Sequence, residues 1–190
     1  AALELGLLLQ ILGREDAAPV LTRVASVVEV ATEPNDLARG ARALRALGRF
    51  QEANAAYRDA AAAAPRDPAI NTAWGDLFLE KYNRSEALKS YQVALRENGS
   101  YEPALAGSAR ALSEDNPPEA IETAKRALAI NRSDVSVHVF LAREAADAGR
   151  RDEARKSLQE ALAVNPSSLD AHALLAAIAF IEDNVSEFDG

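Results

Sequence analysis

The sequence predicts an all-α fold, an α-solenoid of stacked antiparallel helix pairs. The first observation is a short repeated pattern whose alanines recur every 33 or 34 residues, at Ala53, Ala87, Ala120 and Ala154. A fixed period of this length is the signature of a repeat architecture. The second observation is composition, because aromatic residues make up only 5% of the chain and alanine is abundant. Such a composition favours closely packed helices over sheets.

The period divides the chain into units of about 1–33, 34–67, 68–101, 102–134 and 135–168, with a partial unit over 169–190. We expect these units to form one array over residues 1–190. The chain contains no methionine and stops within an expected second helix, whereas a solenoid normally ends in a polar capping element. We therefore expect this sequence to be an excerpt of a longer protein.

The first unit is a weaker copy of the repeat. Leu5, Leu9 and Ala18 fit the pattern, and Gly13 separates the two expected helices. Pro19 stands early in the second helix, where a proline is tolerated because the first turn leaves its N–H groups unpaired.

The unit from Pro34 and the unit from Pro68 are the clearest copies. Their shared positions are occupied by Ala41, Leu44, Ala53, Tyr57 and Ala60 and by Gly75, Phe78, Ala87, Tyr91 and Ala94.

The unit over 135–168 shows how each pair is delimited. Asp134 is a good N-cap for a first helix, and Gly149 supplies the left-handed residue that ends it. The second helix stops at Pro166, because proline cannot continue a helix. The unit before it is one residue short near Asn116. In the partial unit, Leu169–Phe180 is predicted to be another first helix.

These positions resemble the tetratricopeptide repeat family, whose units carry a small residue in the first helix, an alanine and an aromatic in the second, and a closing proline. Trp74, Gly75, Ala87 and Tyr91 show the match well. The resemblance implies a right-handed superhelix with a concave groove lined by the first helix of each pair. It also implies that the chain is a protein-interaction module that binds a protein or peptide partner.

The register selects the residues expected to face that groove. One column contains Arg42, Asp76, Arg110 and Arg143, and the neighbouring positions hold Asn35, Arg39, Thr72, Ser136 and Val139. Because guanidinium groups bind carboxylates in a bidentate way, we hypothesise that the groove takes an extended acidic segment or a C-terminal carboxylate. In the alternative interpretation, these arginines are solvated and form ion pairs with Asp76, Glu80, Glu114 and Asp147, which contribute little.

Composition excludes several classes of function. The net charge of −8 argues against nucleic-acid binding, which needs a basic surface. No cysteine is present, and His138 and His172, 34 residues apart, have no third ligand at metal spacing, so no metal site is predicted. The sequence contains no catalytic or cofactor-binding motif, so we expect neither enzymatic activity nor a cofactor.

The longest apolar run is too short to span a membrane. Cytoplasmic and exported locations both remain compatible, and the abundance of alanine, arginine and leucine suggests a bacterial source.

Two other functions remain open. The segment could serve as a structural spacer or self-assembly module, through an open C-terminal end formed by Leu174, Leu175, Ile178 and Ile181. It could also be a non-catalytic docking or regulatory region of a larger enzyme. Whichever holds, the register predicts that Ala87 and Ala154 are buried where two helices approach closely.

Overall fold

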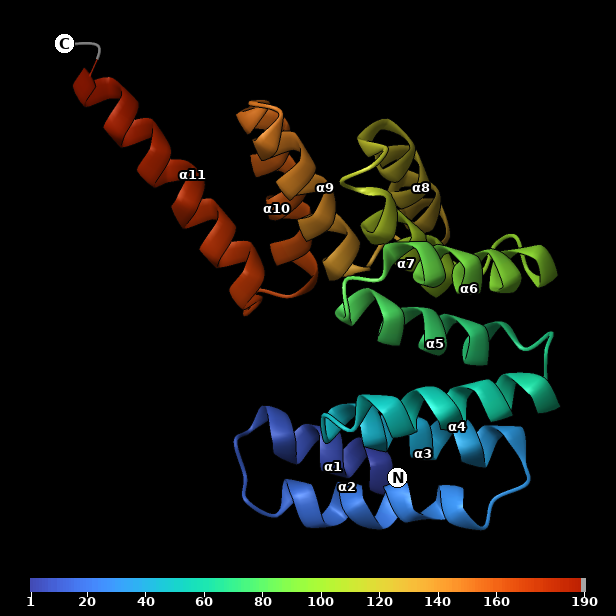
Figure 1. Cartoon of the computed structure of the whole chain (residues 1–190). Coiled ribbons are helices and arrows are strands. Elements are labelled where there is room, and N and C mark those ends of the chain that lie inside the picture. Colours follow the sequence, from blue (N-terminus) through green and yellow to red (C-terminus); the bar gives the residue numbers. More distant parts are fainter. Residues whose placement is uncertain (189–190) are drawn as a thin grey trace. The chain divides into compact units, whose positions relative to one another are not determined.

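The structure is a computed structural model that describes the backbone of residues 1–188 and the side chains of residues 1–181. In this part of the chain all regular elements are helical, which confirms the predicted all-α class (Figure 1). The helices are α1 (Ala2–Ile11), α2 (Ala17–Ala25), the short 3-10 helix η1 (Ser26–Glu29), α3 (Pro34–Ala46), α4 (Phe50–Ala63), α5 (Pro68–Glu80), α6 (Arg84–Glu97), α7 (Glu102–Leu112), α8 (Pro117–Ile130), α9 (Val135–Asp147), α10 (Arg151–Val164) and α11 (Leu169–Phe188).

The helices belong to two compact units, unit 1 (Ala1–Gly107) and unit 2 (Ser108–Gly190). In unit 1, α1 pairs with α2, α3 with α4, and α5 with α6, and each pair stacks on the next. In unit 2, α9 pairs with α10, and both α8 and α11 lie against this pair. The stacked helix pairs confirm the predicted solenoid class. The expectation of one array over the whole chain stays a prediction.

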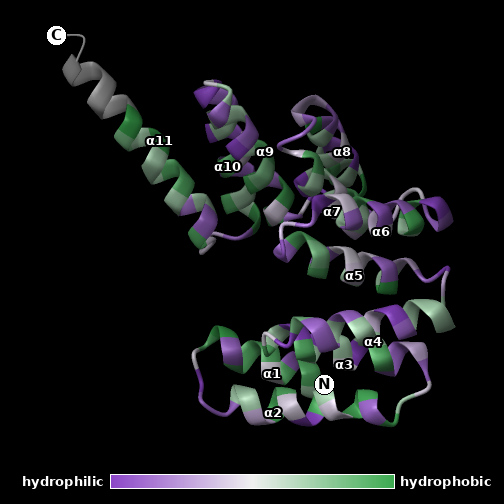
Figure 2. Ribbon diagram, viewed as in Figure 1, coloured by the Kyte–Doolittle hydropathy of each residue, from purple (hydrophilic) through white to green (hydrophobic). Residues whose placement is uncertain are grey.

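Side-chain caps and a left-handed glycine delimit several of the helices. The Asp67 carboxylate accepts hydrogen bonds from the N–H groups of Ala69 (2.8 Å) and Ile70 at the start of α5. Asp134 caps α9 in the same way, as predicted. Gly149 adopts a φ of 74° after α9, which confirms its predicted role in ending that helix. Amphipathic faces are visible along most helices in Figure 2.

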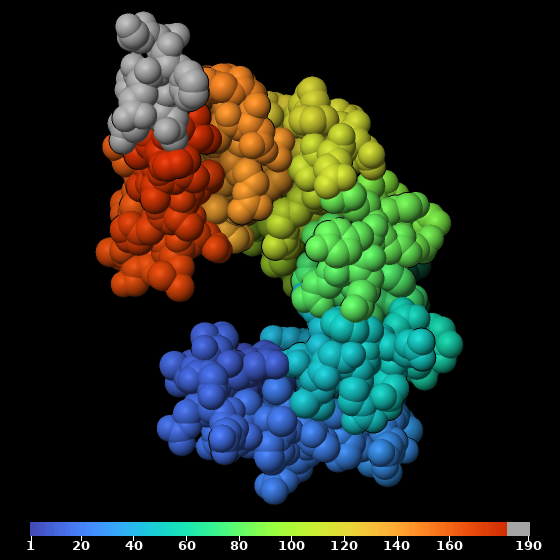
Figure 3. Space-filling view, turned by 60° about the vertical axis from the view of Figure 1, so that its left-hand side comes forward, coloured from blue at the N-terminus to red at the C-terminus, as the bar shows by residue number. Residues whose placement is uncertain are grey.

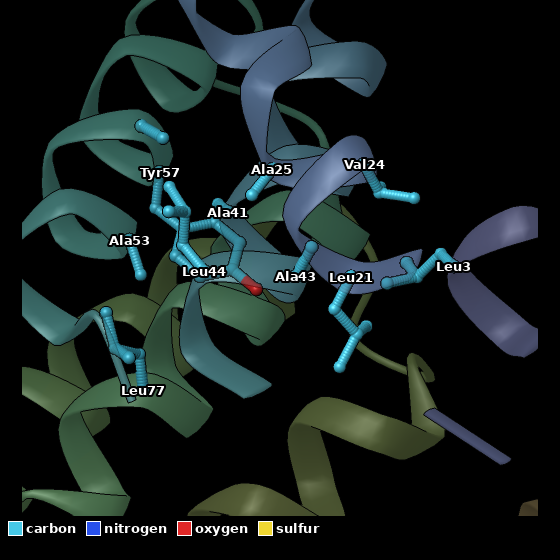
Figure 4. Close-up of a cluster of buried hydrophobic side chains, with 11 residues drawn as sticks. Leu3, Leu21, Val24, Ala25, Ala41, Ala43, Leu44, Ala53, Tyr57 and Leu77 are labelled. Atoms are coloured by element: carbon cyan, nitrogen blue, oxygen red, sulfur yellow. The ribbon is translucent and has the colours of Figure 1, made fainter. Parts of the chain in front are cut away.

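The four repeat alanines are fully buried, as the register predicts. Ala53 belongs to a core cluster to which α1, α2, α3, α4 and α5 all contribute (Figure 4). Ala154 belongs to a second cluster in unit 2, formed by α9, α10 and α11. In Figure 3 the N-terminal helices of unit 1, in blue, form one closely packed body. The small residue of each second helix thus allows close contact with its partner.

Two glycines enclose the ring of Tyr91, which is completely buried in unit 1. A Cβ atom added to Gly75 of α5 would lie 2.6 Å from the ring atom Cε1 of Tyr91. A Cβ atom added to Gly107 of α7 would lie 2.4 Å from its Cζ atom. Because real Cβ atoms essentially never come this close to another heavy atom, both positions require glycine.

The apolar stripe of α11 differs from the open surface that the sequence suggested. Ile178 is buried, and it packs with Leu174 and Leu175 against the α9–α10 pair. Ile181 is exposed, as expected, and among the described side chains of α11 Leu169 and Phe180 are exposed as well. The correction follows from the stacking, because the stripe is the face by which α11 joins the preceding pair.

The two histidines hold the turns that precede their helices. His138 Nε2 donates to the carbonyl oxygen of Arg132 at 2.9 Å, and His172 Nε2 donates to that of Pro166 at 2.9 Å. Asn71 occupies the equivalent place in α5, and its amide donates to the carbonyl oxygens of Pro65 and Asp67. A polar side chain at this position of the first helix therefore stabilises, by hydrogen bonding, the turn that joins it to the preceding pair.

Candidate functional site

A groove in unit 1 brings together most of the residues that the sequence predicted there. It is a cavity of about 570 Å³ formed by α1, α3, α5 and the beginning of α7. Its charged lining residues are Glu4, Arg39, Arg42, Arg45 and Asp76, and Asn35, Thr72 and Tyr101 add polar groups. We refer to this cavity as the arginine groove.

Five of the nine residues predicted to face a partner line the arginine groove: Asn35, Arg39, Arg42, Thr72 and Asp76. Asn35 and Arg39 are exposed and belong to the first half of α3, and Arg42 follows one turn later. The first helix α3 contacts both α1 and α5, so side chains of these helices meet in one groove. The register therefore selected residues that lie in one cavity, and their role in binding a partner stays a prediction.

The groove arginines form ion pairs within unit 1. Arg42 Nη1 lies 3.5 Å from Glu4 Oε1, and both side chains are largely exposed. Arg39 Nη2 lies 2.7 Å from Asp36 Oδ1, one turn earlier in α3. Ion pairs this exposed contribute at most about 1 kcal/mol, so a ligand carboxylate can exchange with Glu4 or Asp36 at small cost.

Arg45 is a groove residue that sequence reasoning missed. Its Nη2 donates to Glu80 Oε1 at 2.5 Å, and its Nη1 lies 3.9 Å from Asp76 Oδ2. Burial works to lower the pKa of the Arg45 guanidinium, but Glu80 and Asp76 outweigh it and raise that pKa. The partners proposed for the arginine column, Asp76 and Glu80, are therefore engaged by Arg45. The sequence feature that could have identified Arg45 is its position three residues after Arg42, which places both on the same face of α3.

Asp76 is fixed in the groove by the core beneath it. The hydroxyl of Tyr91 donates to Asp76 Oδ1 at 2.7 Å. Because Tyr91 is itself held between Gly75 and Gly107, the position of this carboxylate depends on the packing of three helices. Asp76 therefore orients Arg45 rather than offering a free negative charge to a ligand.

A second cavity, of about 610 Å³, extends from the arginine groove toward the C-terminal ends of α1, α3 and α5. The two cavities share Arg42 and Arg45. Leu7, Gln10, Phe50 and Glu80 also line the second cavity. Together the cavities follow the length of α3, which suits an extended polymer better than a compact ligand.

Thr72 lines the groove but is only 4% exposed, and its hydroxyl has no hydrogen-bond partner in the described part of the chain. A buried polar group without a partner costs about 1–3 kcal/mol. We predict that Thr72→Val, which keeps the shape and removes the hydroxyl, raises the free energy of unfolding by about 1 kcal/mol. Denaturant unfolding of the variant and of Thr72→Ser, which keeps the hydroxyl, would measure it. A less stable valine variant would contradict the packing described here.

Tyr57 lies below the groove, with its side chain completely buried. Burial raises the pKa of its hydroxyl to about 12 from the ordinary value of 10.0, although the charges of Arg45 and Arg42 oppose the shift. Between these two values the unfolded chain loses this proton and the folded chain keeps it, so stability falls as pH rises. We predict a loss of about 1.4 kcal/mol per pH unit there, which Tyr57→Phe removes. Unfolding at pH 9, 10 and 11 would show this difference in slope.

The remaining predicted residues belong to unit 2. Arg110 of α7 and Arg143 of α9 are exposed. Ser136 is exposed too, but its hydroxyl donates to the capping carboxylate of Asp134 at 2.6 Å. Val139 is buried in the α9–α11 cluster, so it contributes to the core rather than to a free surface. The cluster that contains Val139 is formed by α9, α10 and α11 together.

The described residues contain no group of three or more histidine, cysteine or carboxylate side chains placed to hold a metal ion. Among the helices described, none combines the length and the apolar character that crossing a membrane requires.

Comparison with known proteins identifies the repeat. Two tetratricopeptide repeat family models match, one over residues 39–103 and the other over residues 111–178. The first match contains α4, α5 and α6, and the second contains α8, α9 and α10. No curated protein matches the chain.

Solved structures of similar fold are numerous. TTC0263, a thermophilic TPR protein of Thermus thermophilus, is 24% identical with a TM-score of 0.78, and the match covers 94% of this chain and 97% of TTC0263. YrrB, a TPR protein with an unusual peptide-binding site, is 15% identical with a TM-score of 0.61, over 90% of this chain and 89% of YrrB. The Cut9–Hcn1 hetero-tetramer of the APC/C contains a chain that is 21% identical, with a TM-score of 0.72, over 90% of this chain and 34% of that one. At these identities the likeness concerns the fold.

Proposed function

Because the chain belongs to the tetratricopeptide repeat family, whose repeats generally mediate protein–protein interaction, we propose that it binds a protein or peptide partner in the arginine groove of unit 1. The observation that carries this proposal is the cavity of about 570 Å³ that contains Asn35, Arg39 and Arg42 on one face of α3. The role is that of a non-catalytic interaction module.

The partner segment is acidic and extended. Arg39 and Arg42 lie one turn apart, and their present partners, Asp36 and Glu4, are held only in exposed ion pairs. Carboxylates of a bound segment replace these partners and gain the bidentate geometry that guanidinium groups favour. The exposed amide of Asn35 can donate to and accept from the backbone of the same segment.

The test is a titration of the protein with a fluorescent peptide made of glutamate and aspartate residues. We expect saturable binding at low salt that weakens as salt is added, because the contacts are exposed charge pairs. Arg42→Ala should weaken binding by up to about fivefold, since it removes an exposed ionic contact of at most about 1 kcal/mol.

The matched control is Arg58→Ala. Arg58 lies in α4, outside the groove, and forms an exposed ion pair with Asp59 much as Arg42 does with Glu4. The two variants change net charge equally, so a general electrostatic effect weakens both. Equal affinity of the two variants would refute a site at Arg42.

A second candidate function is self-association through the C-terminal end. It is supported by the exposed apolar side chains of α11, namely Leu169, Phe180 and Ile181. Phe180 and Ile181 are adjacent in sequence, and exposed apolar residues that gather in one patch often belong to an interface. Sedimentation over a range of concentrations tests it: a protein that stays monomeric, or a Phe180→Ser variant that associates as strongly as the parent, would exclude this route.

A further inference from the structure

Unit 1 contains a third cavity, and only Arg39 of the residues predicted from sequence lines it. It has a volume of about 420 Å³ and lies between the N-terminal half of α1, the C-terminal half of α2 and η1. Its walls are mostly apolar and come from Leu3, Leu5, Val20, Val24 and Val27. Figure 4 labels Leu3 and Val24 at the same end of the buried cluster. We refer to this space as the apolar cavity.

The apolar cavity adjoins the arginine groove. Leu3 and Arg39 line both, so a segment lying in the groove along α3 passes its mouth. The volume falls within the range of about 300–1,000 Å³ typical of ligand pockets, which are largely apolar and have few polar groups. One bulky side chain of a segment in the groove can therefore reach it without a separate binding event.

The charged residues of the apolar cavity are both cations. Arg39 engages Asp36, whereas the guanidinium of Arg23 forms no ion pair or hydrogen bond within the part of the chain that the structure describes. No carboxylate is among the lining residues described for this cavity. An apolar chamber with an uncompensated guanidinium complements an apolar group that has a carboxylate beside it.

Resting on the function proposed above, we infer that the partner segment carries a bulky apolar side chain that enters the apolar cavity, next to an acidic residue that pairs with Arg23. The arginine groove binds the acidic side chains of the segment. The apolar cavity favours those acidic segments that also carry a bulky apolar side chain. Burial of the side chain supplies affinity that exposed charge pairs cannot, because those pairs are screened by salt.

The experiment compares two acetylated and amidated peptides of glutamate and aspartate, one with phenylalanine and the other with serine at its centre. The phenylalanine peptide should bind about tenfold or more tightly, and its advantage should persist at high salt. In Val27→Asp, which places a carboxylate in the apolar cavity, that advantage should disappear while the serine peptide binds as before. Val30→Asp is the matched control, because Val30 is 83% exposed and lies outside the cavity.

A second variant guards against a folding defect in Val27→Asp. Arg23→Gln removes the positive charge but keeps a polar side chain at an exposed position, and it should weaken binding of the phenylalanine peptide more than binding of the serine peptide. Equal affinity of the two peptides for the parent protein would overturn the apolar cavity and leave the groove intact. If the phenylalanine peptide still bound more tightly than the serine peptide in both Val27→Asp and Arg23→Gln, the assignment of the apolar cavity would also be overturned. Absence of binding by either peptide would overturn the proposed function itself.

Discussion

Gly107→Ala is expected to lower the free energy of unfolding by about 1–3 kcal/mol, because the new methyl group would overlap the buried ring of Tyr91. The ideal Cβ position lies 2.4 Å from Tyr91 Cζ and 2.8 Å from its hydroxyl oxygen. Alanine favours the helix by about 1 kcal/mol over glycine, so a net loss means that the overlap exceeds this gain. Denaturant unfolding followed by circular dichroism measures the difference.

Two controls isolate this overlap. Gly99→Ala adds a methyl group whose nearest neighbour would be a carbonyl oxygen at an ordinary 3.7 Å, so its effect should be small. In a Tyr91→Leu background, which removes the ring, Gly107→Ala should cost less than in the parent protein. If Gly107→Ala stabilised the parent as a simple helix substitution does, the enclosure of Tyr91 between α5 and α7 would be incorrect.

Ala87→Leu is expected to be comparably damaging, at about 1–3 kcal/mol. Ala87 is fully buried in the pair α5–α6, whose helices are in extensive contact. A leucine there must push the helices apart or adopt a strained rotamer. The control is Ala62→Leu, an exposed alanine near the end of α4, which should change stability by less than about 0.5 kcal/mol. A melting temperature of Ala87→Leu equal to that of the parent would contradict the repeat register.

The sequence predicted the helix pairs and their register because those depend on local and periodic signals. The buried alanines recur in four units, and the Asp cap and the left-handed glycine each recur in more than one, so one repeat supports the interpretation of the next. The turn at Tyr82 shows the limit of this reasoning. Tyr82 has a φ of 56° in the turn between α5 and α6, whereas glycines, Gly48 and Gly149, have positive φ in the turns between α3 and α4 and between α9 and α10. A residue other than glycine thus adopts the left-handed conformation there, which the repeat pattern did not predict.

The charge pairing in the groove could not be predicted from the repeat alone. The register places Arg42 and Asp76 at equivalent positions in successive units, but it does not determine which of several nearby arginines meets which carboxylate. Long side chains reach across helices, and Arg45 was better placed to bond Glu80 than any residue of the predicted column. Similarly, Val139 matched the spacing of the groove residues, yet it is buried in the cluster that α9 forms with α10 and α11.

The apolar cavity escaped sequence analysis for a different reason. Its walls come from the first, weakest unit, in which α2 is short and continues into η1. Nothing in the period marks this departure as a cavity, because the apolar residues involved are ordinary core residues by pattern. Only the three-dimensional arrangement shows that Val20 and Val27 leave space beside Leu3.

The most direct test of the account is the location of an acidic peptide bound to the ¹⁵N-labelled protein, mapped by changes in amide chemical shifts. The account predicts that the largest changes cluster on the shared face of α1, α3 and α5, around Ala38, Arg42 and Ala73, which line the arginine groove. Amides of α4 around Arg58 should change little. Changes confined to α4 or to unit 2, with the amides of α3 unaffected, would contradict the claim that the arginine groove is the binding site.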